Sequence, residues 1–162
     1  AGAMHTYSFC MHGAGFGVIH QTIAGRKVDK PLRQGAGGQP VYLLGAPGDH
    51  ALCQKIKSGS INTGIHILCG SLSLLQSAAL MKNAVMNYVN DSAPLHLASA
   101  TNAPVTAFFC STLPEFGFGP LSDNARTIGV DELSCRPCGL HGFKACPLGH
   151  FKCGHGMVLP IS

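Results

Sequence analysis

The chain has 162 residues, which is enough for one compact domain. With 46% hydrophobic and 11% charged residues, it lies far from the composition of disordered chains. No run of 18 apolar residues occurs, so the sequence predicts no membrane span, and its start lacks the basic and apolar regions of a signal peptide.

Apolar runs of strand length recur along the chain, with helix-like segments between them. We expect strands at 6–11, 39–45, 65–70, 86–90, 104–110 and 125–130, and helices at 48–59, 71–84 and 91–103. Strands that alternate with helices are typical of an α/β protein. The pattern therefore predicts a Rossmann-like parallel sheet with helices on both faces, although residues 13–38 show no clear helical period.

The helix expected at 71–84 has an apolar face. Leu74, Leu75, Ala78 and Met81 are predicted to share it, with Ser71 or Ser73 as the N-cap.

Three loops follow expected strands, at the sheet edge where open α/β folds bind ligands. In NDSAPLH a strand runs directly into a helix, whose free N–H groups suit a diphosphate, and Asp91, Ser92, Ala93 and His96 lie there. The alternative interpretation is a plain N-cap Asp and a core His.

The other two loops give weaker signals. CSTLPEFGFGP contains Ser111 and Thr112 after the most apolar strand, and CGSLSL contains Ser73 at a strand-to-helix junction. An ordinary Pro/Gly loop explains the first equally well. GAGFG at 13–17 lacks the spacing of a dinucleotide fingerprint, so it does not predict NAD binding.

The eight cysteines fall into two groups. Those in apolar surroundings are expected to be reduced core residues, namely Cys10, Cys53, Cys69 and Cys110. The others form C-x2-C-x7-C-x6-C, in which CRPCG resembles a zinc knuckle: Cys135, Cys138, Cys146 and Cys153. This spacing favours a structural zinc, with His150 as a fifth candidate ligand, and leaves free thiols, disulfides or an iron–sulfur cluster as alternatives.

The carboxyl-terminal tail is basic, because no acid follows Glu132 while Arg136, Lys144 and Lys152 remain. These cations either meet phosphates or an anionic membrane face, or offset metal-bound thiolates.

The run from Gly70 to Thr112 resembles glycosyltransferase family 9, the ADP-heptose:lipopolysaccharide heptosyltransferases. The family pattern appears here as three groups: Gly70, Ser73 and Leu74; Asn90, Asp91, Ser92, Pro94 and His96; Cys110, Ser111 and Thr112. The resemblance covers roughly 39–153 and implies the carboxyl-terminal, donor-binding half of a GT-B enzyme.

The resemblance implies transfer of heptose from ADP-heptose to the lipopolysaccharide core, without a required metal. It implies donor contacts by Asp91, Ser92, Ala93 and His96, with Ser111, Thr112 and Ser73 nearby. The catalytic base belongs to an amino-terminal domain that this chain lacks, so the chain alone is expected to bind donor without catalysing transfer.

The sequence departs from the family pattern in two further places. His20 falls near a position where the family has a phosphate-binding Lys, and Ala93 replaces a common Gly. We expect a Rossmann-like domain at 1–133, poorly matched over 1–38, and a Cys-rich tail at 134–162.

The implied location is cytoplasmic, with peripheral contact at the inner face of the inner membrane as a further option. A competing hypothesis is a zinc-ribbon-like module that binds nucleic acid or protein through the basic tail, and a third is a non-catalytic nucleotide-sugar-binding protein. The absence of general aromatic–basic interleaving argues against nucleic acid.

Overall fold

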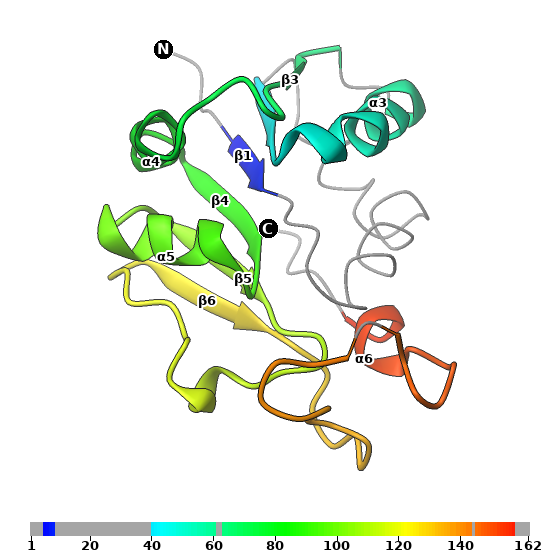
Figure 1. The fold of residues 1–162 in the computed structure, drawn as a ribbon. Helices are drawn as coiled ribbons and strands as arrows, with labels where there is room; N and C mark the ends of the chain where they lie inside the picture. The colour runs from blue at the N-terminus through cyan, green and yellow to red at the C-terminus, as the bar shows by residue number, and fades with distance from the viewer. Residues whose placement is uncertain (1–4, 9–39, 61–62, 144, 158–162) are drawn as a thin grey trace.

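A six-stranded parallel sheet forms the centre of the computed structural model, which describes residues 5–8, 40–60, 63–143 and 145–157 (Figure 1). The strands are β1 (His5–Ser8), β2 (Val41–Leu44), β3 (Ile65–Ile67), β4 (Met86–Asn90), β5 (Val105–Phe108) and β6 (Ala125–Ile128). Their order across the sheet is β3-β2-β1-β4-β5-β6, and every neighbouring pair is parallel. This confirms the predicted fold class.

The order of the strands reverses at β1. From there the chain builds β2 and β3 on one side and β4, β5 and β6 on the other. Because all strands are parallel, their carboxyl ends share one edge, as shown by Val89 lying level with Ser8 and Ala107. This reversal opens a crevice at that edge, where α/β folds place their ligands.

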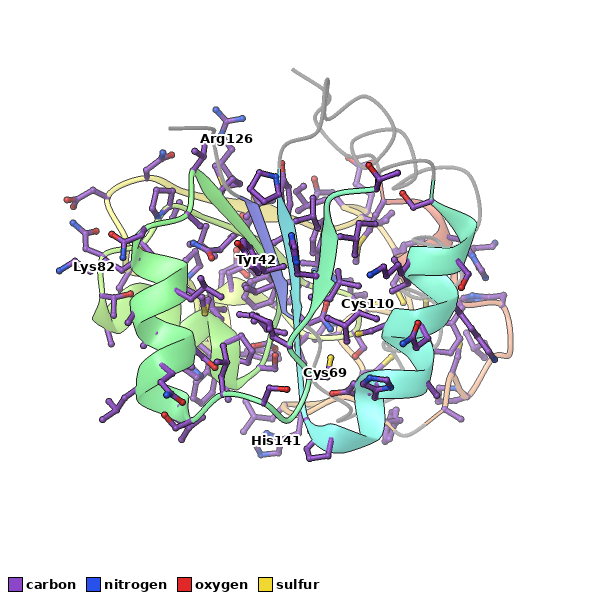
Figure 2. All side chains as sticks on the ribbon, turned by 90° about the horizontal axis from the view of Figure 1, so that it is seen from above. Tyr42, Cys69, Lys82, Cys110, Arg126 and His141 are labelled. Carbon is purple, nitrogen blue, oxygen red and sulfur yellow. The ribbon has the colours of Figure 1, made fainter. Side chains whose placement is uncertain are left out.

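Helices cover both faces of the sheet. They are α3 (His50–Gly59), α4 (Leu74–Lys82), α5 (Ala93–Ala100) and α6 (Lys152–His155), with 3-10 turns η1 (Pro47–Asp49) and η2 (Pro114–Phe116). Figures 1 and 2 show α4 and α5 side by side on one face and α3 on the other.

Two apolar clusters fill the space between the sheet and these helices. Leu43 packs with Cys53 and Ile56 of α3, whereas Leu44 packs with Met81 of α4 and Leu95 of α5. Successive strand residues point to opposite faces, so neighbouring residues enter different clusters. All four residues of β5 are buried, as expected for a strand covered on both faces.

The Cys-rich tail also contributes to the core. Cys153 and Met157 are buried in the same cluster as α3, and Figure 1 shows the tail at the carboxyl ends of β5 and β6. The tail is therefore packed against the edge that carries the candidate site.

The apolar face predicted for α4 is buried only in part. Ala78 and Met81 are buried, but Leu74 is 69% exposed and Leu75 is 82% exposed. The helix begins at Leu74, so these two leucines occupy its first turn at the edge of the sheet, where the strands have already ended.

The amino-terminal predictions are tested only in part. β1 overlaps the strand expected at 6–11, while Cys10, His20 and the rest of residues 9–39 lie outside the described residues. Within the described ranges, no helix combines the length and apolarity needed to cross a membrane.

Candidate functional site

A pocket of about 450 Å³ lies at the carboxyl ends of β2 and β4, beside the loop that follows β3. Three chain segments converge on it from separate parts of the sequence. The residues nearest the strand ends are Gly45, Ala46, Pro47, Gly70, Ser73, Ala93 and Pro94. Ser73 and Ala93, both predicted as donor-binding residues, therefore lie at one pocket.

The side of the pocket after β3 is closed by its own local hydrogen bonds. Ser73 is the N-cap of α4, and its hydroxyl accepts a bond of 3.3 Å from the backbone N–H of Gln76. The Gln76 side-chain oxygen in turn accepts from the Ser73 N–H at 2.8 Å. This capping box decides between the two predicted caps in favour of Ser73 and satisfies two N–H groups of the first turn.

The amino terminus of α5 lacks such a cap. Ser92 occupies the N-cap position, but its hydroxyl donates to the carbonyl of Asn90 at 3.3 Å and makes no capping bond. Pro94 has no N–H and the Leu95 N–H bonds the Ser92 carbonyl at 2.9 Å, so the N–H of Ala93 and the positive end of the helix dipole are what this uncapped start offers to an anion.

Ala93 fits the backbone at this helix start. It has no positive φ, the conformation for which glycine is favoured, so the replacement of the family's common Gly causes no strain. Ala93 is exposed at the pocket, where its small side chain lets a ligand approach the backbone.

The interpretation of Asp91 and His96 as a plain cap and a core residue is wrong on both counts. Ser92 is the N-cap, and His96 is exposed, with its ring edge-on to Phe118 at a centroid distance of 6.3 Å. Contact of His96 with a ligand stays a prediction.

Asp91 and Thr112 come together although 21 residues separate them. The Thr112 hydroxyl donates to Oδ2 of Asp91 at 2.6 Å, and the Asp91 N–H bonds the carbonyl of Phe108 at 3.2 Å. Thr112 is buried and Asp91 is half-buried. The strand ends of β4 and β5 thus fix the direction of the carboxylate beside the open helix start.

Close backbone approaches shape the loop after β2, which sequence reasoning did not connect to the site. Gly70 has φ +72°, and a Cβ there would lie 2.8 Å from Cγ of Pro47. Asp49 is fully buried, and its Oδ2 accepts from the Ala46 N–H at 2.8 Å. The sequence APGD at 46–49 could have indicated this turn, because Pro and Gly favour tight turns and an Asp carboxylate can accept a backbone N–H within one.

Arg136 binds loop carbonyls and is not among the residues that line the pocket at the ends of β2 and β4. Its guanidinium donates to the carbonyls of Val130 at 2.8 Å, Phe109 at 3.1 Å and Thr112 at 2.8 Å. The Arg136 side chain therefore binds the loops that follow β5 and β6. Lys152 is exposed on α6, and Lys144 lies outside the described residues.

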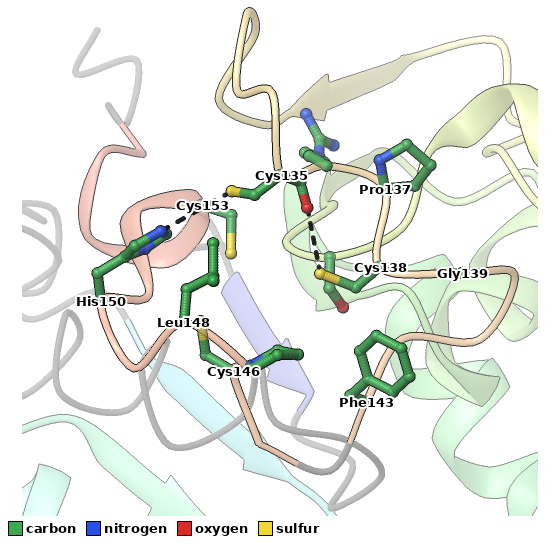
Figure 3. A pocket seen from close by; sticks show the side chains of 12 residues that line it. Cys135, Pro137, Cys138, Gly139, Phe143, Cys146, Leu148, His150 and Cys153 are labelled. Atoms are coloured by element: carbon green, nitrogen blue, oxygen red, sulfur yellow. Dashed lines mark hydrogen bonds between the residues drawn. The ribbon is translucent and has the colours of Figure 1, made fainter.

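The four cysteines of the tail surround a second pocket, of about 320 Å³ (Figure 3). It is lined by Cys135, Cys138, Cys146, Cys153 and His150, and also by Ser111 of the loop after β5. Cys135 Sγ and His150 Nε2 are 4.0 Å apart, and the Cys138 thiol donates to the Cys135 carbonyl at 3.4 Å. As the side chains are placed in the described ranges, no three His, Cys, Asp or Glu form a group that could hold a metal ion.

The tail thiols differ in acidity. Burial raises the pKa of Cys138, as do the neighbouring Cys153, Cys135 and Cys146. The pKa of Cys146 is lowered, chiefly because the backbone N–H of Phe151 donates to its sulfur, with further N–H groups of the same turn. Burial and neighbouring cysteines thus favour the neutral thiol of Cys138, whereas the backbone turn that follows Cys146 favours its thiolate.

The cysteines predicted as reduced core residues are buried and free where the structure describes them, at Cys53, Cys69 and Cys110. Cys53 and Cys69 have their sulfurs 3.0 Å apart, and the pKa of Cys53 is raised by its hydrogen bond with Cys69 and by burial. These thiols belong to the interior of the sheet face covered by α3.

The sheet order and the pocket at its switch point define a Rossmann-like domain of the kind that binds nucleotides. The model of glycosyltransferase family 9 (heptosyltransferase) matches residues 31–145, and the chain belongs to this family.

Three known proteins show the extent of the similarity. Lipooligosaccharide heptosyltransferase 2 of Haemophilus influenzae is 30% identical over 98 residues, which are 59% of this chain and 28% of that protein. The solved structure of E. coli ADP-heptose LPS heptosyltransferase II superposes with a TM-score of 0.63 at 25% identity, covering 88% of this chain and 40% of that one.

A family 9 glycosyltransferase from Veillonella parvula shares the fold, with a TM-score of 0.62 at 21% identity over 78% of this chain and 35% of that one. The chain thus spans less than half the length of each of these relatives.

Proposed function

We propose that this chain supplies the donor-binding half of a heptosyltransferase-like enzyme, which transfers heptose from ADP-heptose to a lipopolysaccharide core. Family membership and the names of two relatives support this donor and acceptor. The zinc-ribbon alternative gains no support from the comparisons, because the family match at 31–145 covers strands β2 to β6 as well as Cys135 and Cys138.

The observation that carries the proposal is the open helix start of α5 beside an oriented carboxylate. The uncapped N–H groups near Ser92 and Ala93 suit the diphosphate of a nucleotide sugar. Asp91, whose carboxylate is held by Thr112, is proposed to accept a hydrogen bond from a sugar hydroxyl. The hydroxyl of Ser73, on the opposite side of the same pocket, retains its proton as a donor to the ligand.

In the proposed reaction the site acts on the leaving group. Negative charge accumulates on the diphosphate as the glycosidic bond breaks, and preorganised N–H groups stabilise that charge. The base that deprotonates the acceptor hydroxyl comes from an acceptor-binding half joined to this one, and contact with the membrane that holds the acceptor belongs to the same assembly. The chain alone is proposed to bind donor without transferring sugar.

The test is calorimetric titration of the chain with ADP and with ADP-heptose. We expect saturable binding of both, and a loss of about tenfold in affinity for Thr112→Val, because the bond that orients Asp91 is removed. Thr112→Ser keeps the hydroxyl and should stay close to the parent. Thr127→Val is the matched control, since Thr127 is exposed on β6.

The same titration is then made with this half joined to an acceptor-binding half of a family 9 relative. Absence of binding in that joined protein overturns the proposal. Equal affinity of Thr112→Val and Thr127→Val would overturn the assignment of Asp91 and Thr112 to the site.

A further inference from the structure

We propose that Cys135, Cys138, Cys146 and Cys153 bind one zinc ion, that His150 hydrogen-bonds one of the sulfurs, and that the ion holds the tail against the loop Ser111–Thr112. All four sulfurs belong to residues that line one pocket of about 320 Å³. Sulfur is a ligand that zinc accepts in closed, four-coordinate structural sites.

His150 is better placed as a hydrogen-bond donor than as a ligand. Its Nδ1 accepts the backbone N–H of Lys152 at 3.1 Å, which requires the ring proton to reside on Nε2. Nε2 faces the Cys135 sulfur at 4.0 Å. An Nε2–H group cannot bind a metal, but it can donate to a thiolate and stabilise its charge.

One other sulfur has a comparable donor, because the Cys110 thiol donates to the sulfur of Cys153 at 3.4 Å. Cys146 begins a tight turn, closed by the bond from the Gly149 N–H to its carbonyl at 3.0 Å. A donor directed at a sulfur stabilises a thiolate, which is the form that binds zinc.

Binding requires the pocket to contract. Sulfurs around a tetrahedral zinc lie about 3.8 Å apart, which follows from a Zn–S distance of about 2.3 Å. No described group yet meets this arrangement, and the Cys138 thiol still donates to the Cys135 carbonyl. Rotation of the Cys138 side chain and release of the thiol protons to solvent complete the site, while Leu148, which lines the pocket and is 63% exposed, is free to swing outward.

The positive charge of Arg136 lies next to this pocket. Arg136 is one of the lining residues. A zinc ion with four thiolates carries a net charge of about −2, which a partly buried guanidinium offsets. The same guanidinium is bound to the carbonyls of Phe109 and Thr112.

The contracted site would therefore fix the loop after β5. The Cys138 N–H bonds the Ser111 carbonyl at 2.8 Å, so a rigid knuckle holds Ser111 directly. Thr112, the next residue, orients Asp91. This coupling to the donor site rests on the proposed function, whereas metal binding itself does not.

The test measures the metal content of the 162-residue chain after purification under reducing conditions, together with cobalt substitution. We expect about one zinc per chain, and strong thiolate-to-cobalt charge-transfer absorption after exchange. Cys138→Ser should lose metal or bind it at least tenfold more weakly. His155→Ala is the matched control, because His155 is exposed in the same segment and should keep its metal.

His150→Ala separates the two roles of the histidine, because it removes the Nε2–H donor, whereas a glutamine amide would keep one. As a donor to sulfur, its loss should leave the stoichiometry and the cobalt spectrum unchanged and reduce affinity by about tenfold. A changed ligand-field spectrum would show that His150 is a ligand and overturn the four-cysteine site. If the cysteine variants fail to fold, zinc is titrated into the unaltered, metal-free chain, which should bind about one zinc ion per chain.

Absence of zinc binding by the reduced chain overturns the proposal, as does iron with labile sulfide in its place. Donor titrations of the zinc-loaded and the zinc-free chain then test the coupling, and equal affinities would overturn it. Because zinc is measured without donor, its absence leaves the proposed function standing, and donor failure leaves the zinc site standing.

Discussion

Two neighbouring regions at the strand ends are held in different ways: the side of the pocket after β3, and the Asp91–Thr112 pair next to the Ala93 side of the pocket. On the side after β3, the first turn of α4 is closed by bonds within four residues, from Ser73 to Gln76. On the side of β4 and β5, Asp91 depends on Thr112, and the Thr112 loop depends on Arg136. The first region is therefore held by bonds between residues close in sequence. The second depends on contacts between distant residues, including Arg136 of the tail.

This difference has a functional meaning under the proposed activity. A helix start that satisfies its own N–H groups has fewer left for a ligand, whereas no side chain of the N-cap residue caps α5 at Ala93. The uncapped start of α5 lies beside groups that are fixed by long-range bonds, from Thr112 to Asp91 and from Arg136 to Thr112. The following predictions break one side at a time.

The largest effect is expected for Arg136→Ala. It removes three charge-assisted bonds to the carbonyls of Val130, Phe109 and Thr112, and should lower the free energy of unfolding by roughly 2–5 kcal/mol. Urea denaturation measures this. Arg136→Lys should recover only part of the loss, because one ammonium group cannot reproduce the planar fork.

Arg126→Ala is the matched control. Arg126 is exposed on β6, so its loss should change stability by no more than about 0.5 kcal/mol. Similar losses for the two variants would show that Arg136 does not hold the loops together.

A pair of glycine substitutions separates backbone strain from contact with the site. Gly139 and Gly142 have φ of +73° and +71°, but a Cβ would meet nothing within 4 Å at Gly139 and would lie 2.5 Å from Oγ of Ser111 at Gly142. Each change to Ala should cost about 1 kcal/mol in unfolding experiments. Only Gly142→Ala must also turn the Ser111 hydroxyl or lift the tail, so only this variant should weaken ADP binding; equal ADP affinities would contradict it.

The same division explains what the sequence made predictable. The strand expected at 86–90 is found at Met86–Asn90, and Ser73 was one of two predicted caps, because alternation and capping act over a few residues. The order of the strands, by contrast, depends on where each crossover connection places the next strand. The sequence pattern predicts a parallel sheet but not the order of its strands.

Contacts across the fold were not predictable. Asp91 and Thr112 were both named as site residues, but nothing in their spacing shows that one would orient the other. Arg136 was expected among phosphate-binding or charge-balancing cations, and its bonds to carbonyls 24 and 27 residues away depend on tertiary packing. Leu75 likewise follows a helical apolar pattern but lies where no strand covers it.

The smallest effect is expected on the side of the pocket after β3, for Ser73→Ala. The variant removes the capping oxygen of α4, which should cost about 1 kcal/mol of stability, while Ser73→Asp restores a capping acceptor. Thermal unfolding of both variants measures this cost. Ser73→Asp, however, places a negative charge at the pocket, so it should recover stability and weaken ADP binding. If it recovers both, Ser73 caps the helix without facing the donor phosphates, and the open start of α5 alone provides the anion site.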